Sequence, residues 1–231
     1  MRILSLFSKL LFPPVCLVCK KGVDIDNEFF ICPDCESDLP IESSLFDGIS
    51  KQRLPYLKRL EYPTGSFLLI SPLSYHDDRV KQLILRLKFS KLLAFAKPLG
   101  HLSAKAIELS EFDFSEFIVT YIPLHPSRER TRGFNQSEVI ARIVSKHSTL
   151  PLHSTLKRTV NTKVQSSLSE RSERIKNVSG AFTALDPVFL KGKKFLIVDD
   201  VCTSGATLSQ ACRTLKHAGA TTVVALAAAK A

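Results

Sequence analysis

The sequence contains no apolar run of the roughly 18 residues that a helix needs to cross a bilayer. Its first residues, MRILSLFSKLLFPPV, include Lys9 within the apolar stretch, and no small-residue cleavage site follows, which argues against a secretory signal. Their apolar positions have helical spacing, so we expect an amphipathic helix packed on the rest of the chain. The sequence also lacks internal repeats and low-complexity tracts. These absences favour a cytoplasmic globular protein with no membrane span.

Acidic residues are scarce: 22 Asp and Glu stand against 32 Lys and Arg in 231 residues, which gives a formal net charge of +10. The imbalance is also local, because residues 79–97 hold six bases and no acid. A basic surface is typical of proteins that meet nucleic acid, phosphorylated metabolites or a membrane surface, although such a run is also common on a solvated face. If the partner is nucleic acid, we expect its backbone to be bound by Lys81, Arg86, Lys88 and Lys91. Phe89 or Phe134 is then available to stack on a base.

Four of the six cysteines form two short motifs, CLVC and CPDC, which are separated by twelve residues. Two such pairs bring four thiolates within reach of one ion, and zinc is the ion that tetrahedral sulfur suits best. The predicted zinc ligands are Cys16, Cys19, Cys32 and Cys35. Four protein ligands leave no open position, which indicates a structural site. The alternatives are two disulfides of a secreted protein, or a nucleic-acid-binding ribbon with Lys20 and Lys21 on its first knuckle.

Predicted strands and helices alternate after the cysteine motifs. We divide the chain into residues 1–42 for the amphipathic N-terminal segment with the four-cysteine zinc motifs, 43–66 for a connector and 67–231 for a larger domain. Asp77 or Asp78 can cap the first helix of that domain, and Pro98 with Gly100 is expected to interrupt it. Compact apolar runs at residues 117–122 and 195–198, and an alanine-rich run near residue 225, predict buried strands. The alternation predicts an α/β fold, with a mostly parallel sheet flanked by helices.

The run FLIVDDVCTSGATL, residues 195–208, places two acids where a buried strand is expected to end. Ligands of open parallel sheets sit outside the carboxyl ends of the strands. Adjacent carboxylates there can accept hydrogen bonds from the vicinal hydroxyls of a ribose. The hydroxyl-rich turn that leads into a helix offers backbone amides and a positive dipole to a phosphate. An Asp-Asp pair alone is more often a turn or a helix cap, but the full order describes a cradle for a ribose 5-phosphate.

That order resembles the phosphoribosyl pyrophosphate (PRPP) motif of type I phosphoribosyltransferases. The resemblance implies that Asp199 and Asp200 hold the ribose hydroxyls and form the catalytic pair. It assigns the 5-phosphate to Thr203, Ser204, Gly205, Ala206 and Thr207. It also implies a type I phosphoribosyltransferase-like domain, with magnesium bound alongside PRPP.

PRPP also carries a pyrophosphate, so a second anion-binding loop is expected. The segment after residues 117–122 places Arg128, Arg130 and Arg132 close together, and guanidinium groups fork onto phosphate oxygens. In the phosphoribosyltransferase fold this loop handles pyrophosphate, which makes residues 124–127 the matching backbone. Another polar stretch resembles the mobile loop that closes over substrate in these enzymes, or is a solvated hairpin or helix. Its candidate side chains are Lys163, Gln165, Arg171 and Arg174.

A closer resemblance joins motifs along nearly the whole chain. They are LLFPPVCLVC with CPDC, the segment at residues 75–89, RGFNQ at residues 132–136, the run at residues 162–182, and VDDVCTSGAT. Together they resemble the ComF family of competence proteins, in its ComFC-like form with a zinc finger before a phosphoribosyltransferase-like domain. The resemblance implies a small zinc-ribbon-like module, the handling of single-stranded DNA during natural transformation, and contacts with other DNA-uptake or recombination proteins.

Two functions follow from these patterns. As a binding protein, the chain would hold PRPP in a phosphoribosyltransferase-type site while its basic surface handles single-stranded DNA. The alternative is an active phosphoribosyltransferase, purine or amidophosphoribosyltransferase-like, that acts on an unidentified small-molecule acceptor, with His125 as the nearest candidate proton carrier. The sequence identifies no acceptor pocket, and Cys16 and Cys19 belong to the metal pattern, so an amidotransferase nucleophile is lacking. These points favour the binding protein.

Overall fold

A computed structural model describes residues 14–24, 27, 29–38, 57–61, 66–110, 112–161 and 177–231. The expected N-terminal amphipathic helix lies outside these ranges, as does the candidate mobile loop with Lys163, Gln165, Arg171 and Arg174. Within the described ranges, no helix combines the length and the apolar character that a membrane crossing requires.

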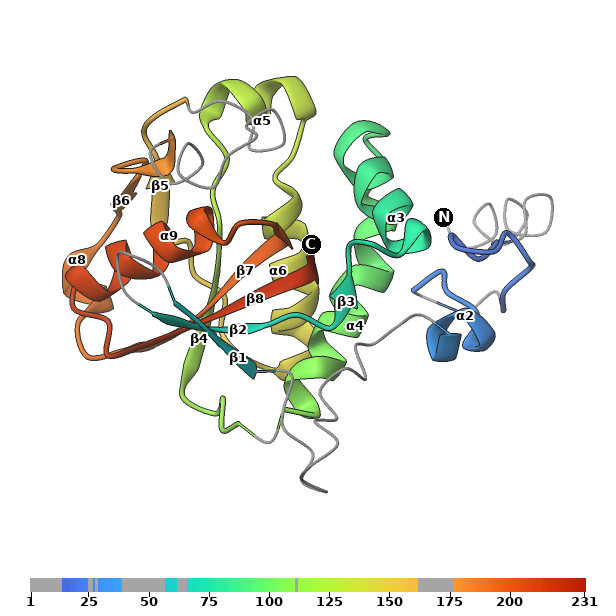
Figure 1. Cartoon of the computed structure of the whole chain (residues 1–231), viewed down its shortest axis with the longest axis horizontal. Helices are drawn as coiled ribbons and strands as arrows, with labels where there is room; N and C mark the ends of the chain where they lie inside the picture. Colours follow the sequence, from blue (N-terminus) through green and yellow to red (C-terminus); the bar gives the residue numbers. More distant parts are fainter. Residues whose placement is uncertain are drawn as a thin grey trace, which may run out of the picture.

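A six-stranded sheet forms the centre of the molecule (Figure 1). Its order is β1 (Leu57–Leu60), β2 (Phe67–Ile70), β8 (Thr222–Lys230), β7 (Lys194–Cys202) and β4 (Phe117–Tyr121), and β3 (Leu73–Ser74) also pairs with β8. Every pairing is parallel except that of β1 with β2. The mostly parallel sheet confirms the predicted α/β class.

Alternate residues of β7 face opposite layers of the molecule. Leu196 and Val198 belong to a buried cluster under α3 (Asp78–Phe89), α4 (Ala96–Glu108) and α6 (Gln136–Ser148). Phe195 and Ile197 belong to a second cluster, under α9 (Ala206–His217), and Figure 1 shows α9 on the opposite side of the sheet. Each fully buried Leu, Ile or Phe contributes about 1.5–3 kcal/mol. A strand buried on both faces is therefore a rigid support for the residues at its carboxyl end.

A smaller antiparallel sheet pairs β5 (Leu156–Arg158) with β6 (Phe182–Ala184), and α8 (Pro187–Leu190) follows it. Leu156 and Phe182 share the buried cluster of Phe195. The small sheet therefore packs on the same face of the central sheet as α9.

Asp77 caps α3, as predicted. Its carboxylate accepts hydrogen bonds from the backbone amides of Arg79 and Val80 at 2.8 and 3.3 Å. The helix ends at Phe89, and a 3₁₀ turn, η2 (Leu93–Phe95), leads into α4. The break between the helices therefore lies at residues 90–92.

The predicted interruption at Pro98 and Gly100 is wrong, because both residues lie inside α4. Pro98 occupies the first turn, where a missing amide costs no intrahelical hydrogen bond. Gly100 is explained by packing, since a Cβ at this position would lie 2.7 Å from the Cβ of Ile143 on α6. The glycine allows α4 and α6 to approach closely.

β1 lies within residues 43–66, which the sequence analysis treated as a connector. Its sequence, LKRL, is too short and too charged to be distinguished from a loop by pattern. The strand nevertheless pairs with β2 along all four residues. The sheet therefore begins before the predicted boundary at residue 67.

We call the described residues between 14 and 38 the cysteine module, which includes α2 (Pro33–Asp38). The module packs against α4: the Glu36 carboxylate lies 3.1 Å from Nε2 of His101 and 3.0 Å from Nζ of Lys105. The ring of Phe29 also stacks on His101 at 4.0 Å. Figure 1 shows the module beside α3 and α4. It is docked on the helical layer that covers one face of the sheet.

Candidate functional site

The four predicted zinc ligands meet at one point of the cysteine module. Their Sγ atoms all lie within 4.8 Å of one another, and those of Cys19 and Cys32 are 3.7 Å apart. A tetrahedral zinc ion with Zn–S distances of about 2.3 Å requires sulfurs roughly 3.8 Å apart. All six cysteines are free thiols, which removes the disulfide alternative. The donor set and its spacing fit a structural zinc ion.

Backbone amides also support thiolates at this centre. The amide of Cys32 donates to Sγ of Cys16 at 3.5 Å, and the amide of Cys35 donates to Sγ of Cys32 at 3.4 Å. Burial alone would raise the pKa of Cys16, but hydrogen bonds from the backbone at Cys19, Cys32 and Val18 outweigh it and lower that pKa to about 6. Burial and the neighbouring thiols raise the pKa of Cys35, and the pKa of Cys32 is raised despite the hydrogen bond from the amide of Cys35. Zinc binds the deprotonated form, so these amides favour metal binding.

The paired acids lie inside β7, and the strand does not end before them as the sequence analysis expected. β8 continues alongside, with Asp199 opposite Ala227 and Cys202 opposite Lys230. Because that partner strand extends the ladder, β7 reaches Cys202. Asp199 and Asp200 are 8% and 9% exposed, so both carboxyl groups are largely removed from water.

Asp199 is held by the N-terminal turn of α6. Its Oδ1 accepts hydrogen bonds from Oγ of Ser137 at 2.8 Å and from the amide of Asp200 at 2.9 Å. Burial raises the pKa of Asp199 to about 7, and the charge of Asp200 adds to the rise, while these hydrogen bonds and Lys88 lower the pKa. A group that titrates near neutrality at a sheet edge is typical of a functional site.

Asp200 forms an ion pair that the sequence analysis did not foresee. Nζ of Lys88, near the end of α3, lies 3.0 Å from Oδ2 of Asp200. Burial alone would lower the pKa of Lys88, but the charge of Asp200 and the hydrogen bond to it raise that pKa. Lys88 was expected on a DNA-binding surface, and the structure places it in the acid site.

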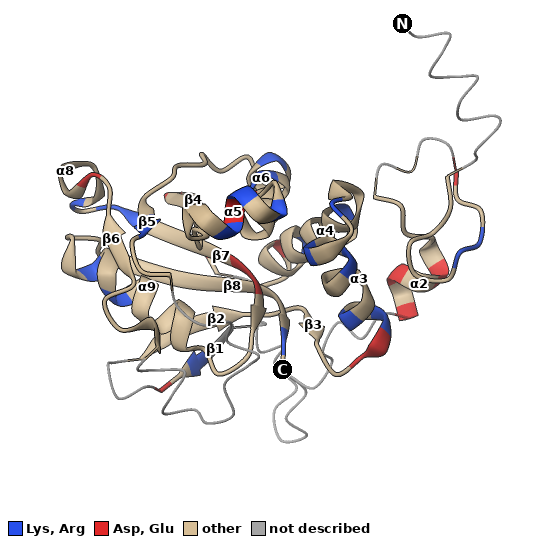
Figure 2. Cartoon of the chain, turned by 90° about the horizontal axis from the view of Figure 1, so that it is seen from above, with Lys and Arg blue, Asp and Glu red and all other residues tan. Residues whose placement is uncertain are grey.

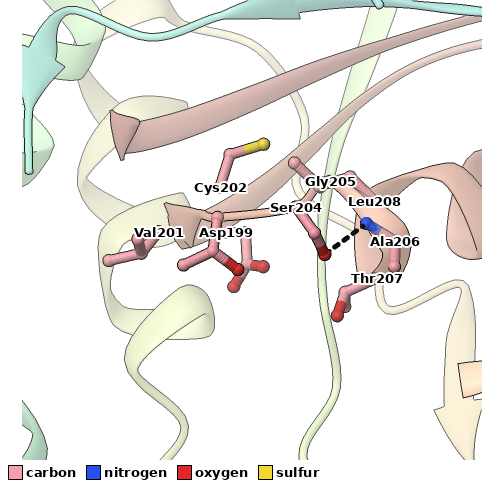
Figure 3. A pocket seen from close by; sticks show the side chains of 9 residues that line it. Asp199, Val201, Cys202, Ser204, Gly205, Ala206, Thr207 and Leu208 are labelled. Atoms are coloured by element: carbon pink, nitrogen blue, oxygen red, sulfur yellow. Dashed lines mark hydrogen bonds between the residues drawn. The ribbon is translucent and has the colours of Figure 1, made fainter. Parts of the chain in front are cut away.

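The turn between β7 and α9 forms a small hollow next to Asp199 (Figure 3). Gly205 has a φ of +76°, a left-handed conformation that favours glycine, and it directly precedes α9. Oγ of Ser204 accepts a hydrogen bond from the first amide of the helix, at Ala206, at 3.4 Å. The hollow is lined by residues 201–208 and Asp199 and has a volume of about 10 Å³. It has room for about one water-sized group, such as one oxygen of a phosphate.

The predicted phosphate-binding residues are all brought to this turn. Thr203 is exposed, Ser204 and Thr207 are half-buried, and Gly205 and Ala206 are buried. The thiol of Cys202 is buried, which raises its pKa to about 12 and argues against a role as a nucleophile.

The three predicted arginines lie on α5 (Pro126–Arg132), whose start is capped by His125. Burial lowers the pKa of Arg132, and the charge of Asp200 acts against this shift, so Arg132 lies within electrostatic reach of the acids. The Nη1 atom of Arg132 donates to Oε1 of Gln136 at 2.7 Å. Arg128 is half-buried and its charge also lowers the pKa of Arg132, so these two side chains lie within electrostatic reach of each other, whereas Arg130 is exposed.

Arg158 of β5 is a further cation that the sequence analysis missed. It is 8% exposed, and burial lowers its pKa. The charge of Arg128 lowers this pKa further, whereas the charge of Asp199 raises it. Arg158 therefore lies within electrostatic reach of both Arg128 and Asp199. Its position depends on the pairing of β5 with β6, for which no local motif exists.

The RGFN stretch explains how Ser137 reaches Asp199. Gly133 ends α5 with a φ of +88°. Asn135 caps α6, because its Oδ1 accepts a hydrogen bond from the amide of Ser137 at 3.1 Å. Nδ2 of Asn135 also donates to the carbonyl of Ile122, at the end of β4, at 3.0 Å. The motif thus fixes the start of α6 against the sheet and aims Ser137 at the acids.

Comparisons with known proteins agree with this arrangement. Residues 7–51 match the double zinc ribbon domain family, and residues 135–230 match the phosphoribosyl transferase domain family. DNA utilization protein YhgH of Escherichia coli O157:H7 is 30% identical over 214 residues, which cover 90% of this chain and 87% of that protein. Competence protein F of Haemophilus influenzae is 25% identical over 211 residues, covering 89% and 85%. Competence protein ComFC of Streptococcus pneumoniae is 27% identical over 211 residues, covering 84% and 85%. The chain belongs to the ComF family, with a zinc ribbon ahead of a phosphoribosyltransferase-type α/β domain.

Proposed function

We propose that the protein binds PRPP at the carboxyl end of β7 and handles single-stranded DNA in the cytoplasm. The observation that supports this best is the contiguity of a buried acid pair with an amide-lined turn at the start of α9. Carboxylates accept hydrogen bonds and amides donate them. A single ligand that carries hydroxyls and a phosphate would donate hydrogen bonds to the carboxylates and accept them from the amides.

The acids would bind the ribose hydroxyls. Asp199 already has donors in Ser137 and the backbone, and it retains further acceptor capacity on Oδ2. Asp200 shares its carboxylate with Lys88. A ribose hydroxyl would donate to the same carboxylate while Lys88 keeps its charge balanced.

The pyrophosphate would be bound by the basic side of the site. Arg128, Arg132 and Arg158 are the cations there. The buried Nε2 of Gln136, next to Arg132, has no hydrogen-bond acceptor among the described residues, which fits a site that an anion completes. Magnesium, which prefers oxygen ligands, would bind together with PRPP and balance the charge of its pyrophosphate.

Two observations support the proposed DNA binding: the net charge of the chain and the names of its relatives. The formal net charge is +10, and relatives bear the names competence protein and DNA utilization protein. Figure 2 shows Lys and Arg on each of four helices: α3 and α4, which come before β4 in the chain, and α5 and α6, which come after it. Cationic surface of this kind binds nucleic-acid phosphates with little regard to sequence.

Catalysis is a second candidate function, favoured by the phosphoribosyl transferase match over residues 135–230. In that reaction the bond between C1 of the ribose and pyrophosphate breaks, and an acceptor nucleophile forms a new bond to C1. The leaving pyrophosphate takes the bonding electrons, and its negative charge would be stabilised by the arginines.

The test is calorimetric titration of PRPP with magnesium. Asp199→Asn with Asp200→Asn should abolish the heat of binding, and Thr207→Val, which leaves the acids intact, should weaken binding about tenfold, as the loss of a charge-assisted hydrogen bond does. Asp78→Asn with Glu108→Gln changes two exposed acids and serves as the control. Unaltered binding in both site variants would refute the assignment.

The same samples distinguish binding from catalysis. Pyrophosphate release across a panel of purine bases and amines identifies a transferase. Binding without release supports a protein that uses PRPP as a ligand.

A further inference from the structure

A larger cavity lies where the cysteine module meets α4 and α6. Its volume is about 370 Å³, and its lining consists of Phe29, Lys97, Arg142, Ile143, Lys146 and His147. We propose that this cavity, the module cavity, binds the backbone and unpaired bases of single-stranded nucleic acid. The proposal gives a location to the DNA binding that the proposed function includes, and it depends on that part of the proposed function.

The cations of the module cavity are available to phosphates. Lys97, Arg142 and Lys146 converge from two helices. Arg142 pairs with Glu138 one turn earlier, at 2.6 Å, but most of its side chain is exposed. No ion pair joins Lys97 or Lys146 to a carboxylate of the residues that the structure describes. Two of the three cations therefore face the cavity with no ion-pair partner among the described residues.

Aromatic rings form another wall of the module cavity. The Phe29 ring lies 5.2 Å from the His147 ring and 4.0 Å from the His101 ring, on which it stacks. Nζ of Lys97 lies 4.8 Å above the ring of the neighbouring Phe30. Rings interleaved with cations are typical of sites for single strands, where bases stack on side chains while phosphates meet the cations. In a duplex the bases are stacked on one another and are not free to enter.

The module cavity is separate from the acid site, although α6 serves both. Ser137, at the start of α6, contacts Asp199, and Lys146 lies nine residues further on. With a rise of 1.5 Å per residue, this places the two positions about 13 Å apart along the helix. Substitutions at the cavity can therefore be made without touching the groups assigned to PRPP.

The docking of the cysteine module completes the cavity. Phe29 belongs to the module, whereas the three cations belong to α4 and α6. The contacts of Glu36 with His101 and Lys105 fix the module in the position that brings Phe29 to the cavity. The zinc ribbon would thus contribute to DNA binding by forming a wall of the site.

The experiment compares two charge variants of the full-length, zinc-loaded protein. Arg142→Gln with Lys146→Gln removes two cavity cations. Arg213→Gln with Lys216→Gln removes two exposed cations from α9, on the opposite face of the sheet, and is the matched control. Binding of a labelled oligothymidylate is followed by fluorescence anisotropy over a series of salt concentrations, and PRPP titrations run in parallel.

The cavity variant should bind at least about tenfold more weakly than wild type at low salt, and its slope of log K against log salt should be shallower by about 1.4, about 0.7 for each lost phosphate contact on a single strand. The control should match wild type, and PRPP binding should be unchanged in both. Equal losses in both variants, or none in the cavity variant, would overturn the location and leave the proposed function intact. A duplex that competes as well as the single strand would overturn the assignment to unpaired bases. Failure of the wild-type protein to bind oligothymidylate would overturn the DNA half of the proposed function itself, whatever the PRPP titration shows.

Discussion

At the scale of single residues, the acid pair illustrates how a ligand site is kept stable before its ligand arrives. Two adjacent buried carboxylates repel one another and lose hydration. The protein relieves this by different means at each residue: Ser137 and a backbone amide hold Asp199, and Lys88 neutralises Asp200. The charge of Lys88 is thereby used for the site and is withdrawn from the outer basic surface.

Replacing Lys88 by Met should lower the free energy of unfolding by about 3–5 kcal/mol, because Asp200 is left buried without its ion-pair partner. Adding Asp200→Asn to the same chain should recover most of that loss. Urea unfolding of the two single variants and the double variant gives the coupling energy. A loss below about 1 kcal/mol for the Lys88 variant would show that the pair behaves like an exposed one.

Asp199 should make the fold less stable as the pH rises. Its pKa is raised to about 7 in the folded state from an ordinary value of 3.8, so between these values the folded protein holds a proton that the unfolded chain has lost. Protonated Asp199 is tolerated at low pH, and stability is lost as the group ionises towards pH 7. Asp199→Asn should therefore stabilise the protein at pH 8 and have little effect near pH 4. Thermal or urea unfolding at both pH values checks this, and equal destabilisation at both would contradict the assigned pKa.

At the scale of secondary-structure elements, the sequence predicts site residues that are contiguous in the chain. It does not predict site residues that folding brings together from separate elements. The two cysteine motifs and the stretch from Asp199 to Thr207 each carry their chemistry within a few residues, so spacing alone locates them. Lys88, Ser137 and Arg158 come from α3, α6 and β5. Only the pairing of strands and the packing of helices bring them to the acids, and no local pattern encodes that.

Helix boundaries show the same limit. Proline and glycine within a few residues of each other usually predict a break, yet Pro98 falls in a first turn and Gly100 at a contact with α6. The reason for Gly100 is the Ile143 side chain, more than forty positions away. By contrast, the cap at Asp77 is a local signal, and it is confirmed.

At the scale of the whole molecule, removal of zinc should affect the cysteine module first. A structural zinc site contributes about 10–16 kcal/mol of apparent binding free energy, and a module of this size has little other core. After chelation, amide hydrogen exchange should become fast between residues 14 and 38 while β7 and β8 stay protected. Restored zinc should restore protection. Unchanged exchange in the module would contradict a structural metal, and simultaneous loss of protection in β7 would show that the two parts unfold as one unit.

The position of β8 in the sheet has a consequence for synthesis of the protein. β2 and β7 do not pair with each other, and each pairs with β8, which is made more than twenty residues after Asp199. While a ribosome is still translating, both strands therefore have unpaired backbone edges and uncovered apolar faces, which are prone to aggregation. The stretch of β7 that carries the acid pair would therefore acquire its final geometry only once residues 222–230 have paired with it.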